Sequence, residues 1–180
     1  FDVQRGQICG LIGANGAGKT TLFNCMSRLY AYQAGDILLE GRSITQEPTH
    51  RIAALGLGRT FQNLAMFQRM TVTDNVMVGA HARSSAGFVA SALRLPSVRA
   101  EEQRLRERAR QILADLALAP YAERLAGDLP FAIQKRVELA RALAAEPEML
   151  LLDEPAAGLN HEELQALSGL IRDVRDRLRI

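Results

Sequence analysis

The chain has 180 residues, of which 48% are hydrophobic and 23% are charged, with 22 Lys and Arg against 20 Asp and Glu. These proportions exclude a disordered tail, a collagen-like repeat and a disulfide scaffold, and they indicate a globular domain with room for a small subdomain. A net charge of +2 gives no electrostatic case for binding nucleic acid. No apolar run approaches the roughly 18 residues of a membrane span.

The first third of the chain alternates predicted strands and helices. Residues 7–13 are an apolar run that predicts a buried strand, and residues 18–29 carry apolar side chains at helical spacing. A further strand is predicted at 36–40, between turn glycines, and a short helix at 51–55, which Gly56 ends.

The middle of the chain is predicted to be helical. Residues 72–81 fit a helix with Thr71 or Thr73 as its N-cap, and residues 83–96 fit a loop or a weak helix. Residues 99–116 predict an amphipathic helix that is too short for several heptads, so a packed subdomain is favoured over a coiled coil. Its apolar stripe consists of Leu105, Ala109, Ile112, Leu113 and Leu116.

The last third returns to helix and strand. Residues 132–145 predict a helix with Pro147 as its stop, and residues 149–153 predict a buried strand. Residues 162–180 predict a helix with one apolar face. A strand–helix pattern that is interrupted by helices and then resumes indicates an α/β core with an inserted helical subdomain.

Residues 13–20 fit the phosphate-loop pattern G-x-x-x-x-G-K-[ST], after a predicted strand and at the start of a predicted helix. Backbone N–H groups of such a loop form an anion nest, and the positive end of the helix favours the same phosphates. We expect Lys19 to reach the β- and γ-phosphates, Thr20 to offer its hydroxyl to Mg²⁺, and Thr21 to bond the α-phosphate. The predicted nucleotide-binding residues are Gly13, Asn15, Gly16, Ala17, Gly18, Lys19, Thr20 and Thr21.

A second candidate group lies at the end of the predicted strand 149–153. Asp153 and Glu154 follow three leucines, and the ends of parallel strands emerge beside a phosphate loop. Asp153 is therefore expected to hold Mg²⁺ opposite Thr20, and Glu154 to polarise the water that attacks the γ-phosphate.

Several motifs together resemble the ATPase subunits of ABC transporters. They are the phosphate loop, Gln62 within Arg-Thr-Phe-Gln-Asn, and the run Leu-Asp-Glu-Pro-Ala-Ala-Gly-Leu-Asn at 152–160. Residues 129–143 lie where that family has its signature segment and the following helix, and residues 59–62 with 70–76 resemble the branched-chain amino-acid import subfamily. The resemblance covers nearly the whole chain and implies a P-loop NTPase core with a parallel-rich sheet and an inserted helical subdomain.

The resemblance also implies roles. Gln62 matches the Q-loop glutamine, which senses Mg²⁺ and the γ-phosphate. The resemblance therefore implies that Gln62 is both a catalytic and a metal-site residue. Residues 156–160 match the loop that crosses the interface between two cassettes, and residues 61–77 would face the membrane-spanning partner. The implied cofactors are ATP and Mg²⁺. The implied partners are transmembrane permease subunits and a second ATP-binding subunit, at the cytoplasmic face of the inner membrane, with no nucleic acid.

The expected division is a first part of the core at 1–60, the Q-loop and helical subdomain at 61–128, and the rest of the core at 129–180. The signature segment departs from the family's Leu-Ser-Gly-Gly-Gln, since Leu129 is followed by Pro130, Phe131, Ala132 and Ile133. Ala132 replaces a glycine at which the backbone approaches phosphate, so we expect dimerisation around ATP with weakened hydrolysis.

Two family features are expected outside these residues: an aromatic that stacks on adenine before Phe1, and a switch histidine after the last helix. We therefore expect a piece of a longer protein that alone binds nucleotide weakly and turns it over slowly or not at all. His50, His81 and His161 are expected to be surface or cap residues. Two further expectations are that Cys9 and Cys25 are buried free thiols, as in a reducing compartment.

Three alternatives stay open. A DNA-repair or ribosome-associated ATPase would need a long coiled coil or a basic surface. A regulatory module of the same family, with weak or no hydrolysis, fits the altered signature but leaves Glu154 without a use. A small-molecule kinase would need an Arg-rich lid over the site, which this sequence lacks, and it would not explain residues 152–160.

Overall fold

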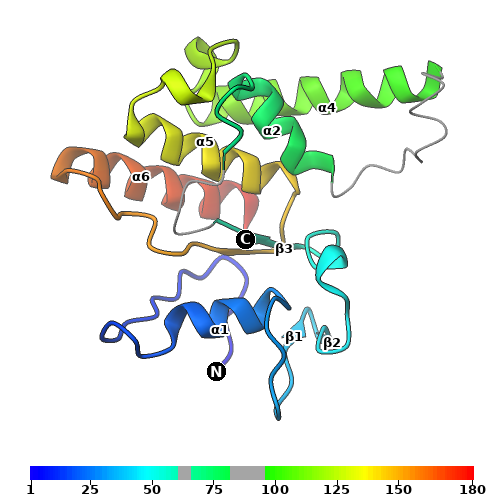
Figure 1. Cartoon of the computed structure of the whole chain (residues 1–180), viewed down its shortest axis with the longest axis vertical. Coiled ribbons are helices and arrows are strands. Elements are labelled where there is room, and N and C mark those ends of the chain that lie inside the picture. The colour runs from blue at the N-terminus through cyan, green and yellow to red at the C-terminus, as the bar shows by residue number, and fades with distance from the viewer. Residues whose placement is uncertain (61–65, 82–95) are drawn as a thin grey trace. The chain divides into compact units, whose positions relative to one another are not determined.

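The computed structural model describes residues 1–60, 66–81 and 96–180. Figure 1 labels the main helices and strands of the chain. The chain divides into two compact units, which we treat separately. The first unit comprises residues 1–62 and 147–180, and the second comprises residues 63–146. The first unit is therefore built from two stretches that are far apart in the sequence.

The first unit mixes helices and short strands. Its elements are α1 (Lys19–Met26), β1 (Leu38–Leu39), β2 (Arg42–Ser43), the 3-10 turn η1 (Thr49–Arg51), β3 (Leu57–Arg59), β4 (Met149–Leu151) and α6 (His161–Leu178). β1 and β2 form an antiparallel hairpin, whereas β3 and β4 pair in parallel. The parallel register sets Arg59 opposite Leu151, so the carboxyl ends of both strands lie at the same edge.

The core of this unit connects the hairpin region to the parallel pair. Ile44, Ile52, Leu57 and Leu151 are each at most 5% exposed and form one cluster. Partly buried side chains from α1, the strands and the turns pack against this cluster, namely Phe23, Met26, Ile37, Leu39, Leu55 and Met149. Burial of these side chains fixes α1 against the strands, since apolar area removed from water is the main stabilising contribution.

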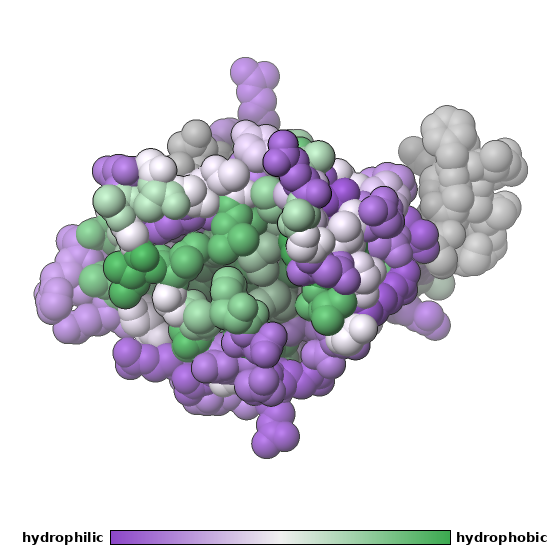
Figure 2. Space-filling view, turned by 90° about the horizontal axis from the view of Figure 1, so that it is seen from below, coloured by the Kyte–Doolittle hydropathy of each residue, from purple (hydrophilic) through white to green (hydrophobic). Residues whose placement is uncertain are grey.

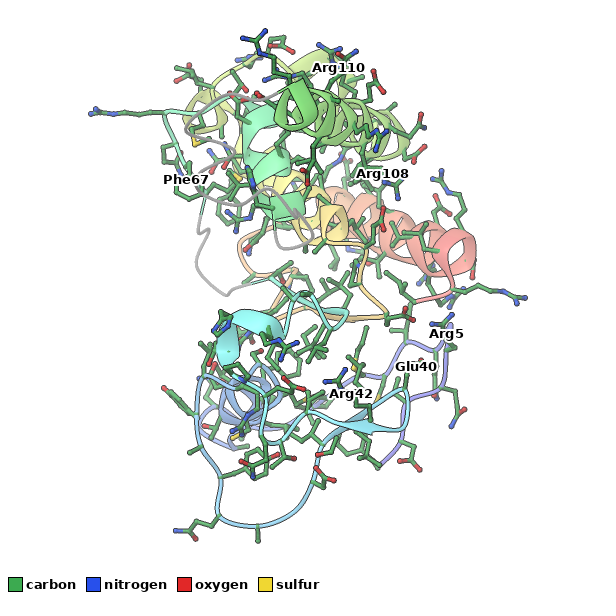
Figure 3. All side chains as sticks on the ribbon, turned by 90° about the vertical axis from the view of Figure 1, so that its right-hand side faces the viewer. Arg5, Glu40, Arg42, Phe67, Arg108 and Arg110 are labelled. Carbon is green, nitrogen blue, oxygen red and sulfur yellow. The ribbon has the colours of Figure 1, made fainter. Side chains whose placement is uncertain are left out.

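An ion pair network ties the N-terminal segment to this unit. The guanidinium of Arg5 pairs with the carboxylates of Glu40 and Glu148, which come from the two separate stretches of the unit. Arg5 and Glu40 are labelled in Figure 3. These groups are exposed, so the pairs contribute little to stability and serve to hold the segment in place.

The strand predicted at 7–13 is wrong. These residues have no strand pairing in the described part of the chain, and Cys9, predicted to be buried, is exposed. Cys25 is partly buried. A strand exists through its ladder of hydrogen bonds, and an apolar run that lacks a paired neighbour keeps its side chains in solvent. Accordingly Ile12 is 95% exposed. Figure 2 shows one face of the molecule, on which apolar residues gather inside a polar rim.

The second unit is helical. It contains α2 (Val72–Ala80), α4 (Pro96–Asp115), the 3-10 turns η3 (Ala119–Tyr121) and η4 (Ala126–Asp128), and α5 (Phe131–Ala144). α2 packs against both α4 and α5, which also contact each other. Of the two N-cap candidates for α2, the structure selects Thr71, whose hydroxyl accepts a hydrogen bond from the Asp74 N–H at 3.1 Å.

The predicted stripe of α4 is confirmed in its C-terminal part. Ala109, Ile112, Leu113 and Leu116 are buried, and Leu105 is half-buried. Arg136 of α5 donates to the carbonyl oxygens of Leu116 and Ala117, which closes the end of α4 onto α5. Burial lowers the pKa of Arg136 from its usual value.

The remaining helices differ from the predictions mainly at their ends. The helix predicted at 18–29 ends at Met26, and the one predicted at 51–55 is a 3-10 turn at Thr49–Arg51 followed by turns. α6 begins with a capping box, in which Asn160 and Glu163 each bond the other's backbone N–H. Among the described helices, none is both long enough and apolar enough to cross a bilayer.

Candidate functional site

The glycines of residues 13–20 shape the turn that leads into α1. Gly16 and Gly18 have φ angles of 81° and 88°, a left-handed conformation that glycine adopts without strain. α1 begins at Lys19, and no side chain caps its N-terminus. The first N–H groups of α1 are thus available to an anion, which the helix dipole also favours.

Lys19 folds back over this loop. Its Nζ donates hydrogen bonds to the carbonyl oxygens of Gly13 at 2.7 Å and Ala14 at 2.9 Å. Two neutral carbonyl oxygens therefore hold the ammonium group over the loop. The charged oxygens of a bound phosphate could take the place of these acceptors. Thr20 and Thr21 follow in the first turn of α1, and both are exposed.

The acidic pair after β4 splits into a buried and an exposed carboxylate. Asp153 is 6% exposed, whereas Glu154 is exposed. Glu154 has a φ of 46°, which is uncommon for a residue with a side chain and begins a turn that the Ala157 N–H closes onto the Glu154 carbonyl. The phosphate loop, Asp153 and Glu154 all belong to the first unit.

Arg59 is the residue of this site that sequence reasoning missed. It ends β3, and its Nη2 lies 3.2 Å from Oδ2 of Asp153, with both side chains 7% exposed. Its Nη1 donates to Oγ of Ser27, the C-cap residue of α1, at 3.1 Å. The available signal was an arginine at the end of a buried strand, which requires a counter-charge.

Asp153 and Thr20 provide oxygen donors, which is the ligand type that Mg²⁺ prefers. Mg²⁺ is bound by one or two carboxylates together with substrate phosphates, rather than by a cage of protein ligands. Asp153 offers a buried carboxylate and Thr20 an exposed hydroxyl, and the described residues contain no cluster of three or more His, Cys, Asp and Glu that could hold a metal. A dedicated zinc-type centre is therefore not formed by this part of the chain.

The altered signature segment opens α5 in the second unit. Pro130 is the N-cap of α5 and provides no side-chain hydrogen bond, and Leu129 before it is buried. Nε2 of Gln134 donates to the Leu129 carbonyl at 2.8 Å. Phe131 is 44% exposed, and Nζ of Lys135 lies 5.7 Å from its ring centroid. Ala132 is partly exposed in the first turn.

Gln62 and Phe61 lie outside the described residues. Of the segment 61–77, residues 66–77 are described, and Asn75 organises them. Asn75 is fully buried. Its side-chain oxygen accepts a hydrogen bond from the Phe67 N–H at 2.9 Å, and its side-chain nitrogen donates one to the Phe67 carbonyl at 3.0 Å. The Phe67 side chain, labelled in Figure 3, is left 50% exposed. A buried amide thus fixes the backbone beneath an exposed aromatic ring.

Comparison with known proteins agrees with the motifs. Residues 1–157 match the family described as ABC transporter. The chain is 41% identical over 173 residues to the high-affinity branched-chain amino acid transport ATP-binding protein BraF of Pseudomonas aeruginosa, covering 96% of this chain and 68% of BraF. It is also 41% identical over 170 residues to LivG of Escherichia coli K12, a protein of the same description, covering 94% of this chain and 67% of LivG.

The fold is likewise that of a solved ATP-binding cassette. The ADP conformation of MJ1267, an ATP-binding cassette of an ABC transporter, superposes with a TM-score of 0.81 at 28% identity, covering 96% of this chain and 67% of that one. The chain therefore belongs to the ABC transporter family, as an ATP-binding cassette with the P-loop NTPase fold.

Proposed function

We propose that this cassette is the ATP-binding subunit of an importer for branched-chain amino acids. The observation that carries the proposal is the uncapped N-terminus of α1 with Lys19 folded over the glycine turn before it. The 41% identity to BraF and LivG supports the class of solute. Binding of ATP would join two cassettes, and hydrolysis would separate them.

The phosphate loop does the binding in this proposal. Its backbone N–H groups and those at the start of α1 surround the phosphates, and the Lys19 ammonium exchanges its carbonyl acceptors for β- and γ-phosphate oxygens. Gly13, Asn15, Gly16, Ala17 and Gly18 provide the loop backbone, and the Thr21 hydroxyl bonds the α-phosphate. Positioning and electrostatic stabilisation are what phosphoryl transfer mainly demands of a protein.

Four further residues carry the chemistry. Asp153 and the Thr20 hydroxyl would hold Mg²⁺, with Gln62 as a further contact to the ion and the γ-phosphate. When bound, Mg²⁺ neutralises charge that develops on the phosphate oxygens. The Glu154 carboxylate orients a water and accepts its proton as the oxygen attacks the γ-phosphorus and ADP departs.

The partners follow from the same proposal. A second cassette would meet this one through residues 156–160 and the start of α5, and permease subunits would contact the surface around Phe67. The chain would then be held at the cytoplasmic face of the inner membrane by its permease. The transported solute would be selected by other subunits.

ATP binding is tested by calorimetry with Mg-ATP on the wild-type chain and on Lys19→Ala. We expect the wild type to bind Mg-ATP and the variant to bind it more weakly by roughly 10- to 100-fold or more. An equal response of both proteins would contradict the assignment of the phosphate loop.

The solute class is tested in Escherichia coli cells that lack LivG and express the full-length protein to which this sequence belongs. Restored uptake of labelled leucine is expected, with labelled ribose as the control solute and Lys19→Ala as the inactive cassette. Expression without restored leucine uptake would count against the branched-chain assignment. It would not affect the assignment of ATP binding, which the calorimetry tests separately.

A further inference from the structure

A buried ion pair occupies the carboxylate that the proposed function assigns to magnesium. Arg59 and Asp153 lie 94 positions apart, their side chains are 7% exposed, and the closest nitrogen–oxygen distance is 3.2 Å. Taking an ionised carboxylate out of water is unfavourable unless a counter-charge compensates it. In this structure Arg59 provides that counter-charge.

Arg59 is itself anchored to the helix that follows the phosphate loop. Its Nη1 donates to Oγ of Ser27 at 3.1 Å, and the Ser27 hydroxyl in turn donates to the Phe23 carbonyl at 2.8 Å. The guanidinium carbon lies 5.9 Å from the centroid of the Phe23 ring. The end of α1 therefore orients the guanidinium toward Asp153. The ion pair joins the last residue of β3 to the residue two positions after β4, and α1 holds the arginine in place.

We propose that Arg59 is the resident counter-ion of Asp153 and that it competes with Mg²⁺ for this carboxylate. The inference rests on the proposed function, since it takes Asp153 as the residue that meets the cation. Arg59 keeps the buried carboxylate compensated while no cation is bound. It must release or share an Asp153 oxygen when the cation arrives, so it lowers the apparent affinity for Mg²⁺. Arg59 is a positioning residue and touches no reacting atom.

The direction of the effect follows from the charges. A carboxylate that already has a cation partner gains less from a second one, and two cations on one carboxylate repel each other. Removal of the guanidinium charge destabilises the cation-free chain, because Asp153 is then buried without compensation. The same removal raises the affinity for Mg²⁺, because the ion becomes the main counter-charge of Asp153.

The test measures the factor by which excess Mg²⁺, relative to EDTA, tightens ATP binding. We expect this factor to be about tenfold larger in Arg59→Met than in the wild type, as for negatively coupled ligands. Arg59→Lys keeps the charge and should stay close to the wild type. Arg42→Met is the matched control, since Arg42 pairs with Glu47 in the same unit and is exposed.

A second readout needs neither nucleotide nor activity. Thermal unfolding in EDTA is measured for wild type, Arg59→Met, Asp153→Asn and the double variant. The double variant should be more stable than the sum of the single changes predicts, which is the coupling of a double-mutant cycle. Additive effects would overturn the counter-ion role.

The remaining outcomes are equally decisive. If Arg59→Met does not fold, Ser27→Ala removes the anchor of the guanidinium while keeping its charge, and it should raise the Mg²⁺ factor by a smaller amount. An unchanged or smaller factor in both variants would overturn the proposed competition. Wild-type chain that binds no ATP would instead contradict the proposed function, while coupling in EDTA would still support the ion pair.

Discussion

The Nζ of Lys19 lies 2.7 Å from the carbonyl oxygen of Gly13, so the ammonium group is held by its own loop. Replacement of Lys19 by Ala removes this contact and the positive charge together. We expect the affinity for ATP to fall roughly 10- to 100-fold or more, because a hydrogen bond to a charged group contributes about 1.5–3 kcal/mol. Calorimetry or a fluorescent nucleotide would measure the loss.

The control for this change is Lys19→Arg. It keeps the charge and should retain part of the affinity, although the planar guanidinium does not fit a site made for a point charge. Circular dichroism should show unchanged helix content in both variants. Equal ATP affinities for wild type and Lys19→Ala would contradict the role given to the loop.

Gly79 determines how closely α2 and α5 approach. A Cβ built at Gly79 would meet the carbonyl group of Arg141, with its carbon at 2.9 Å, and the Arg141 side chain at the same distance. Since the obstacle includes backbone, the helices must move apart. We expect Gly79→Ala to destabilise the chain by about 1–3 kcal/mol, as overpacking does. Urea unfolding followed by circular dichroism would measure it.

Gly169→Ala is the matched control in α6. A Cβ at Gly169 would meet nothing within 4 Å. Alanine loses less conformational freedom on folding than glycine in a helix, so this variant should be more stable by roughly 0.5–1 kcal/mol. Loss of stability in Gly169→Ala of the same size as in Gly79→Ala would show that the effect is not steric.

The parts of this protein that sequence predicts are those with local physical causes. The phosphate loop is a run of adjacent residues whose types are set by backbone conformation and charge. The helices of the second unit follow from their apolar periodicity, as α4 and α5 show. For these elements, a short window of sequence contains the interactions that decide the structure.

The parts that sequence missed depend on distant partners. The apolar run at 7–13 could not be judged without knowing which strand pairs with it, and it remains unpaired here. The partner of Arg59 is 94 positions away, so no spacing rule indicates it. The burial of Asn75 is similar, because its role depends on how the preceding loop folds back onto α2.

Asp36 makes stability sensitive to acid. Hydrogen bonds from the hydroxyls of Ser43 and Thr45, and from the Ile37 N–H, hold the pKa of Asp36 below its usual 3.8. Its contribution to stability is therefore complete above the unfolded-state pKa and is lost as the pH falls through the lower folded-state value. Asp36→Asn should be less stable than wild type at neutral pH, with a difference that narrows below about pH 4.

Urea unfolding at a series of pH values would measure this narrowing. Ser43→Ala is a useful companion, because it removes the largest cause of the lowered pKa and should reproduce part of the acid effect. A stability difference between wild type and Asp36→Asn that stays constant from neutral to acidic pH would disprove the linkage.

Ala132 stands in the first turn of α5, where the family has a glycine. In the proposed dimer this turn meets the γ-phosphate bound by the other cassette, so a methyl group there keeps the backbone N–H groups of α5 from approaching closely. We expect Ala132→Gly to raise the ATPase rate, even though glycine costs helix stability by about 1 kcal/mol. Steady-state phosphate release by wild type and variant, at equal concentrations of folded protein, measures the change.

Ala142→Gly is the control, since it lies later in the same helix. It carries the same cost in helix stability without the proposed contact and should not raise the rate. An unchanged rate in Ala132→Gly would remove the steric explanation for the altered signature.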